Sequence, residues 1–136
     1  MARREITRTE CLDLIARTSV GRVALVVGAL PEIVPVNFQV AGETVVFGVH
    51  SASVLAQDLE GTVVAFQVDS FDAERECGWH VHAIGTLGEA LGADELAVAG
   101  AVVPPSWTRG EEVERVVQIE LTVVSGYVVE APETRR

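Results

Sequence analysis

The sequence predicts a mainly β protein, an antiparallel barrel of about six strands with two or three short helices. Apolar residues make up 49% of the chain and include few aromatics, which favours an aliphatic core. They occur in runs of strand length that turn residues separate. The 136 residues are enough for one domain that buries its own core. We therefore expect a single domain over residues 1–136, with frayed tails at about 1–6 and 131–136.

The first predicted element is a helix over residues 8–17. Thr7 and Glu10 have the spacing of a capping box, in which each side chain accepts a hydrogen bond from the other residue's backbone N–H. Apolar residues then recur at helical spacing. Gly21 opens a β pattern, so the helix ends before it.

A meander of three strands follows this helix. Runs rich in β-branched residues are separated by turns near Leu30-Pro31 and at residues 41–43. The predicted strands are residues 21–29, 32–41 and 44–49.

The chain beyond residue 50 predicts a short helix and two further strands. Ser53 is a suitable cap for a helix over residues 54–61, which Gly61 ends. The next predicted segments are a strand at 62–69, a polar connection at 70–77 and a long strand at 78–91. Glycines at positions 85 and 88 suit bulges in a curved strand.

Two elements remain near the C-terminus. Residues 93–102 predict another helix, which Pro104 and Pro105 end. Residues 114–129 predict one or two strands. We find no internal repeat or linker that would divide the chain.

The net charge of −10 excludes some partners. Twenty acidic residues oppose ten basic ones, and no basic residue lies between Arg22 and Arg75. Such a charge repels polyanions, so we expect no nucleic acid partner. No apolar run approaches the ~18 residues of a membrane span, so we expect no membrane partner.

The cysteines and the N-terminal stretch indicate a cytoplasmic protein. Cys11 and Cys77 have no metal-ligand spacing and form no disulfide framework, which suits a reducing compartment. The stretch MARREITRTECLDL is charged at short intervals and lacks the apolar region of a signal peptide.

Five sequence pieces occur in a distinctive order. A short helix is followed by GRVALVV, PVNF, TVVF, VAFQVDSFD and GWHVHAIG. This order resembles the pyridoxamine 5'-phosphate oxidase-like family, the flavin-binding split barrels, in its actinobacterial branch, over about residues 8–127. The resemblance implies a homodimer with flavin mononucleotide (FMN) at the dimer interface and a small-molecule ligand. In related members a deazaflavin or haem takes the place of FMN.

The resemblance also implies the residues of a cofactor site. PVNF aligns with the strand that lines one side of the flavin ring, where Asn37 would offer an amide, and Trp79 lies in a segment that approaches the ring. Asn37 is alternatively a structural residue, and Trp79 a core residue. The implied cofactor-binding residues are Val36, Asn37, Phe47, Gly48, Val49, His50, Ser51, Ser53, Trp79 and His80.

The stretch GVHSASVL, residues 48–55, departs from the family pattern. FMN-binding members commonly have an Arg-Thr pair and a Gly-Thr-Lys-Leu-like piece here, and this sequence has Gly48-Val49 and Ala-Ser-Val-Leu at 52–55. Losing two charge-assisted hydrogen bonds of ~1.5–3 kcal/mol each weakens phosphate binding by roughly two to four powers of ten. Serine hydroxyls, the amides that open the helix and His50 remain. We therefore expect this loop to hold an anion weakly.

His80 and His82 are two positions apart, so on a regular strand they face the same side. That arrangement is compatible with a metal, a haem or proton transfer. Zinc normally takes three or four ligands and no third residue has a suitable spacing, so we expect no metal site. No nucleophile motif stands out, and a flavin would itself supply the redox chemistry.

Two functions therefore remain open. One is a small-molecule oxidoreductase with FMN or a related flavin, which rests on the resemblance. The other is a flavin-free barrel that binds another small ligand in the same cleft, in a reaction that need not be redox. It rests on the missing cations.

Overall fold

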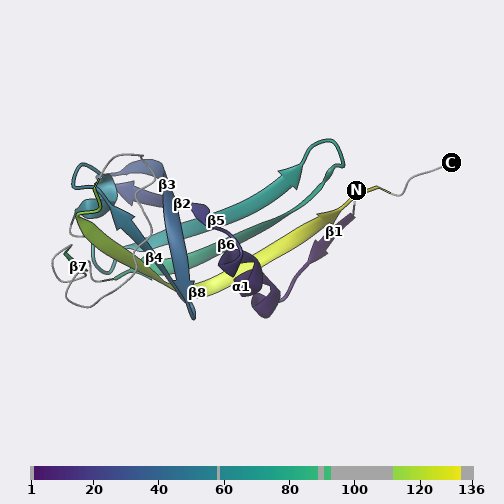
Figure 1. The fold of residues 1–136 in the computed structure, drawn as a ribbon, viewed down its shortest axis with the longest axis horizontal. Coiled ribbons are helices and arrows are strands. Elements are labelled where there is room, and N and C mark those ends of the chain that lie inside the picture. Colours follow the sequence, from purple (N-terminus) through teal and green to yellow (C-terminus); the bar gives the residue numbers. More distant parts are fainter. Residues whose placement is uncertain (1, 58, 89–90, 93–111, 133–136) are drawn as a thin grey trace.

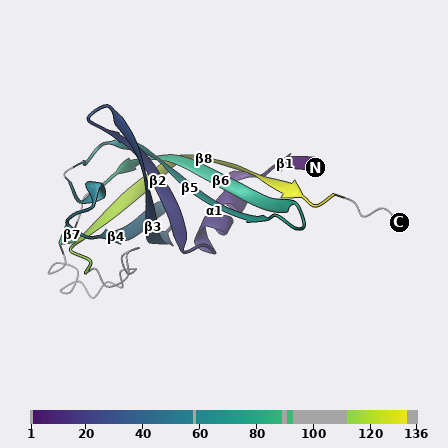
Figure 2. The same cartoon turned by 90° about the horizontal axis from the view of Figure 1, so that it is seen from above.

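The computed structural model describes residues 2–57, 59–88, 91–92 and 112–132, and their strands form one antiparallel sheet (Figures 1 and 2). The strands are β1 Ala2–Glu5, β2 Val20–Val27, β3 Leu30–Ala41, β4 Thr44–Val49, β5 Val63–Asp72, β6 Cys77–Leu87, β7 Leu91–Gly92 and β8 Arg115–Glu130. Six of them, β8-β4-β3-β2-β5-β6, form a closed ring because β6 also pairs with β8. β1 and β7 add to β8 outside the ring. The predicted barrel of about six strands is confirmed.

The N-terminal helix α1, Arg8–Ala16, has the predicted capping box. The Thr7 hydroxyl accepts a hydrogen bond from the Glu10 backbone N–H at 3.2 Å, and the Glu10 carboxylate accepts one from the Thr7 N–H at 3.3 Å. Cys11 and Ile15 of this helix are fully buried in the core. The helix therefore covers an opening of the barrel with its apolar side.

The hairpin of β2 and β3 turns two residues earlier than the sequence predicted. Gly28 and Ala29 form the turn with φ of 56° and 68°, and Val27 pairs with Leu30. Positive φ at both central positions suits the right-handed twist of a hairpin, but alanine rarely adopts it. The prediction of a turn near Leu30-Pro31 was wrong because Ala29 gives no turn signal.

The helix predicted over residues 54–61 is a single 3-10 turn, η1, Val54–Ala56. Ser53 does cap it, since its hydroxyl accepts a hydrogen bond from the Leu55 backbone N–H at 3.2 Å. Gln57 already has extended backbone, with φ of −71° and ψ of 160°. The predicted length was wrong, and the helix predicted over residues 93–102 lies outside the described residues.

The hairpin of β5 and β6 is longer than predicted and extends beyond the ring (Figure 1). Residues 70–72, predicted as part of a polar connection, continue β5 to Asp72, which pairs with Cys77. The Asp72 carboxylate then accepts hydrogen bonds from the Glu74 and Arg75 backbone N–H groups in the turn. Both faces of β5 are exposed here, so its residues are mostly polar and show no strand pattern in the sequence.

Strand β8 is one continuous strand that contacts four others. It pairs with β4 and β7 near its start, with β6 along most of its length and with β1 near its end. The predicted bulge lies between Ile84 and Gly85, where a Cβ on Gly85 would approach the Glu120 carbonyl oxygen to 2.5 Å. The prediction of a frayed N-terminus was wrong, because Ala2–Glu5 pair with the end of β8.

The barrel interior is an aliphatic core that contains three buried phenylalanines. Phe38 and Phe66 meet edge to face with ring centroids 5.0 Å apart, and Phe47 is fully buried nearby in the same core cluster. No helix among the described residues has the length and apolar character needed to cross a bilayer.

The outer face of the sheet bears an exposed row of apolar side chains. Strand register places one residue from each of five neighbouring strands in this apolar row: Ile33, Ala24, Ala65, Ile84 and Val123. Ile33 is 72% exposed and Val123 58%. The next row on the same face, called the histidine row, consists of Pro35, Arg22, Gln67, His82 and Ser125. Isolated surface valines are ordinary, but a continuous row is typical of an interface.

Candidate functional site

The loop after β4 holds His50 in a fixed orientation. Its Nδ1 accepts a hydrogen bond from the Ala52 backbone N–H at 3.2 Å, and its Nε2 lies 3.4 Å from a Glu114 carboxylate oxygen. Both ring nitrogens of His50 therefore have partners, and the partner of Nε2 is a carboxylate. An anion that approached His50 would meet the Glu114 carboxylate.

The serines of this loop provide little further binding capacity for an anion. The Ser53 hydroxyl is used in the cap of η1, and Ser51 is exposed. Because η1 is a single turn, it lacks the aligned peptide dipoles of a longer helix. The amides on which the sequence interpretation relied are therefore weaker anion donors than expected.

A cation distant in the sequence does reach this loop. Arg115 pairs with Val49 across β8 and β4, and its guanidinium donates a hydrogen bond to the Ala56 carbonyl oxygen. Sequence reasoning missed Arg115, because nothing near it in the chain shows which strand it will pair with. Arg115 therefore fixes the loop through the Ala56 carbonyl oxygen.

Three of the sequence-predicted residues point into the barrel. Val36, Phe47 and Val49 are 3%, 0% and 4% exposed and belong to the core cluster. Gly48, between two of them, has no side chain. A ligand could contact this part of β4 only at its backbone atoms. The side chains of Phe47 and Val49 therefore support the loop more than they contact a ligand.

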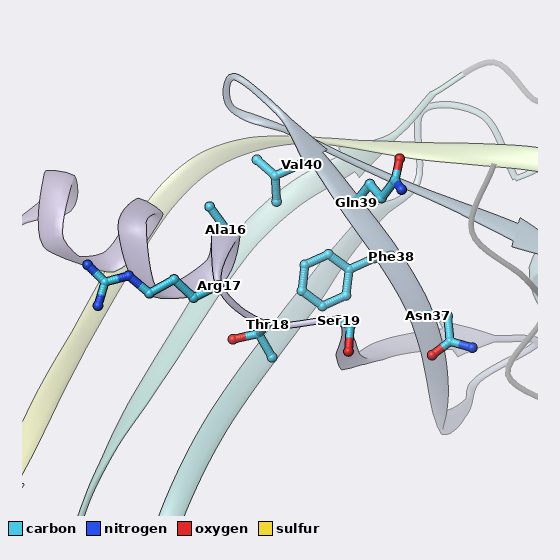
Figure 3. Close-up of a pocket in the computed structure, with 8 residues that line it drawn as sticks. All are labelled: Ala16, Arg17, Thr18, Ser19, Asn37, Phe38, Gln39 and Val40. Carbon is cyan, nitrogen blue, oxygen red and sulfur yellow. The ribbon is translucent and has the colours of Figure 1, made fainter. Parts of the chain in front are cut away.

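Asn37 lies beside the larger of two adjoining cavities. Its side chain alternates with the buried Val36 and Phe38, so it is on the outer side of β3. The cavity has a volume of about 670 Å³, and Figure 3 shows the Phe38 ring between Arg17 and Asn37. The lining residues are Ala16, Arg17, Thr18, Ser19, Asn37, Phe38, Gln39 and Val40.

Trp79 lies beside the second cavity, of about 440 Å³. It packs against the core from β6. The lining residues are Arg17, Thr18, Ser19, Val20, Arg22, Asp69, Ser70 and Trp79. The two cavities share Arg17, Thr18 and Ser19, and we call them together the Arg17 groove. The structure thus brings Asn37 and Trp79, two of the predicted residues, to one groove.

The connection from α1 to β2 gives the Arg17 groove a rigid wall. The Thr18 hydroxyl donates a hydrogen bond to the Leu14 carbonyl oxygen at 2.8 Å, and the Ser19 carbonyl oxygen accepts one from the Phe38 N–H at 3.0 Å. The charged residues lining the groove are Arg17, Arg22 and Asp69. Two cations and one carboxylate thus line the groove, and Arg17 also lines a further cavity together with Glu10 and Asp13.

Trp79 and His80 point to opposite faces of β6. His80 and His82 share the outer face, as predicted, with ring centroids 5.4 Å apart. His80 also stacks at 5.2 Å against Tyr127 of β8, over which the Arg3 guanidinium lies at 3.9 Å. Burial lowers the pKa of the His80 imidazole and His82 lowers it further, whereas Asp69 opposes the shift.

The described residues include no group of three or more His, Cys, Asp or Glu side chains that could hold a metal ion. His82 instead contacts the Ser125 hydroxyl at 3.1 Å. The side chains available for chemistry on this face are therefore the imidazoles of His80 and His82 and the phenol of Tyr127.

The predicted residues lie at two distant ends of the molecule. Val49 pairs with Arg115 and His80 with Tyr127, both on β8. At about 3.3 Å per residue, roughly 40 Å of strand separates these two positions. The loop at residues 50–53 and the Trp79 region therefore cannot contact one ring within a single chain.

An antiparallel split barrel with a polar groove beside its first helix defines the structural class of this protein. The sequence profile of the family described as pyridoxamine 5'-phosphate oxidase matches residues 7–128, and the chain belongs to this family. The resemblance seen in the sequence is thereby confirmed.

Similar proteins occur in actinobacteria. An uncharacterized protein of Mycobacterium tuberculosis is 32% identical over 127 residues, which cover 90% of this chain and 82% of that protein. The FAD binding protein of Mycobacterium smegmatis superposes with a TM-score of 0.70 at 25% identity, covering 95% of this chain and 100% of the other. A candidate pyridoxamine 5'-phosphate oxidase of Corynebacterium glutamicum superposes with a TM-score of 0.77 at 21% identity, covering 98% of each chain.

Proposed function

We propose that this protein is a homodimeric flavin-binding protein that acts as a small-molecule oxidoreductase with FMN or a related flavin. Membership of the family supports a flavin, as does the similarity to the FAD binding protein of Mycobacterium smegmatis. The bound flavin would supply the redox chemistry, which agrees with the absence of a nucleophile motif. The chain's own residues would bind and orient the ring.

The apolar row is the observation on which the dimer chiefly rests. It crosses five strands and leaves Ile33 and Val123 more than half exposed. Neither the apolar row nor the histidine row contains a carboxylate, although the chain has 20 acidic residues. Two copies can therefore bring these faces together without the repulsion that their net charge of −10 creates elsewhere.

The separation of the predicted residues supports the same dimer. A two-fold axis perpendicular to the outer face would place the start of β8 in one copy near the end of β8 in the other copy. The loop at residues 50–53 of one copy then approaches the Trp79 end of the other. Such a dimer has two equivalent sites, each of them built from both chains.

We assign the flavin phosphate to the Arg17 groove rather than to the loop after β4. At the loop, the Arg115 guanidinium donates to the Ala56 carbonyl oxygen, and a Glu114 carboxylate oxygen lies 3.4 Å from His50. In the groove, the Arg17 guanidinium has no ion pair among the described residues. Arg22 lies near the Asp69 carboxylate and donates a hydrogen bond to Gln67, and Gln67 in turn donates one to Asp69. An unpaired guanidinium is the preferred protein partner of a phosphate.

A flavin-free barrel is the second candidate. Its support is the missing Arg and Lys at residues 48–55, together with the use of both His50 nitrogens. In this case the Arg17 groove would bind another small anion beside Trp79.

Titrations with FMN and riboflavin distinguish these proposals, because the two ligands share a ring and differ by the phosphate. We expect FMN to bind at least tenfold more tightly, and Arg17→Gln to bring its affinity to that of riboflavin. Arg75→Gln is the matched control, since Arg75 is exposed on the β5–β6 turn and pairs with Asp72. If neither ligand binds, the flavin-free candidate stands.

The loop can be tested in the same assay. The substitutions Gly48→Arg and Val54→Lys restore the family's cations at residues 48–55. A gain in FMN affinity there, with no loss in Arg17→Gln, would move the phosphate back to the loop. Light scattering that gives a mass near 14.5 kDa at micromolar concentration would refute the dimer.

A further inference from the structure

His80 is held among other side chains on the outer face in a way that favours its neutral form. Its ring lies between His82 and Tyr127, with centroids 5.4 Å and 5.2 Å away. The Nδ1 atom is buried and has no hydrogen-bond partner among the described residues. A protonated imidazole donates through both nitrogens, so protonation would leave a buried N–H without an acceptor.

The groups around His80 do not compensate such a charge. His82 on the same strand and Arg3 of β1 both disfavour it. Two carboxylates lie in the register row of His80. Asp69 of β5 already accepts a hydrogen bond from Gln67 at 2.8 Å and lies 3.6 Å from Arg22. Glu5 of β1, which pairs with Tyr127, is 3.1 Å from Arg3. His82 faces the neutral Gln67 and Ser125 in the histidine row.

The histidines adjoin the surface that a second copy is proposed to cover. His82 lies in the histidine row, directly beside the apolar row, and His80 lies one row further. A second copy would contribute the same two rows, which contain no carboxylate. Protonation of His80 would then place one imidazolium charge from each copy beside this interface, with no carboxylate in either row to offset it. The penalty for desolvating an unpaired charge is larger than that for any polar group.

We propose that the dimer is pH-controlled, and that protonation of His80 separates it into folded monomers between pH 7.5 and 5.5. This inference rests on the proposed homodimer and names the regulation of its interface. Dissociation would divide both composite sites at once, so a bound flavin would be released in the same pH range. Acidic conditions would thus inactivate the protein without unfolding it.

Light scattering and circular dichroism at several pH values test the proposal. We expect the wild-type dimer at pH 7.5, and at pH 5.5 a dimer dissociation constant raised about tenfold or more with the β spectrum retained. In His80→Gln the dissociation constant should be the same at both pH values. The control is His50→Gln, which should keep the wild-type response because His50 lies in the loop after β4, outside both rows.

Each outcome has a separate meaning. A wild-type dimer of equal strength at pH 7.5 and 5.5 refutes the switch and leaves the homodimer intact. A pH response that persists in His80→Gln refutes the role of this histidine, and loss of the β spectrum at pH 5.5 shows acid unfolding in place of a switch. A monomer at pH 7.5 refutes the homodimer itself.

Discussion

Arg22 of β2 lies 3.6 Å from Asp69 of β5, and both side chains line the cavity beside Trp79. Asp69 therefore competes with any anion for Arg22. We predict that Asp69→Asn tightens FMN by up to about fivefold, the range expected for an exposed ion pair, and leaves riboflavin unchanged. Fluorescence titration measures both constants. Asp72→Asn, at the tip of the same hairpin, should change neither, and a gain in it would indicate a general charge effect.

Gly126 lies where β8 passes beneath α1. A Cβ at this position would be 2.6 Å from the His80 carbonyl oxygen and 3.1 Å from the Cys11 sulfur. Because a paired backbone cannot move aside, we predict that Gly126→Ala lowers the free energy of unfolding by about 1–3 kcal/mol. Urea titration measures it. Gly88→Ala is the control, since the obstacle there is the flexible Gln118 side chain and the loss should be smaller.

The two cysteines should differ sharply in reactivity. Cys11 is fully buried, and burial raises the pKa of its thiol, with a further rise from the carboxylate of Glu10. Cys77 is partly exposed at the start of β6. We predict one rapidly reacting thiol per native chain in an aromatic disulfide assay, and two after unfolding. Cys77→Ser should abolish the rapid reaction, and rapid reaction of that variant would contradict the burial of Cys11.

The stability of the fold should fall on acidification through His80. Its folded pKa is lowered, so the unfolded chain binds the proton more tightly. The contribution to stability is therefore complete above the unfolded pKa of about 6.5, and it decreases as the pH falls from there towards the folded value. We predict that the wild type loses melting temperature between pH 7.5 and 5.5 and that His80→Gln loses less. Equal losses at matched protein concentration would exclude His80 as the cause.

The ring of strands was predictable because its signals are local. The capping box at Thr7 and the runs of β-branched residues in β3 and β4 depend on neighbours in sequence, and the capping box and both strands are confirmed. Ala29 shows the limit of such signals, because its positive φ is imposed by the twist of the hairpin and not by its own preference.

The site was less predictable because it depends on contacts between distant segments. Arg115 meets Ala56 and Glu114 meets His50 through strand pairing, which the local sequence does not specify. Arg17 lines the groove only because the end of α1 lies beside β3. Whether Asn37 and Trp79 contact a cofactor stays a prediction, although both line the groove.

The position of β8 in the chain determines when the ring of strands can close during synthesis. Strand β8 is the last strand in the chain and the one that joins β4 to β6. A ribosome that adds ~5–20 residues per second needs several seconds to proceed from Val49 to Arg115. Throughout that time the nascent chain has β4 paired with β3 but not with β8, and an unpaired strand edge is a template for aggregation. The ring therefore closes only after β8 has been made, and expression at lower temperature or with chaperones that shield strand edges should raise the soluble yield.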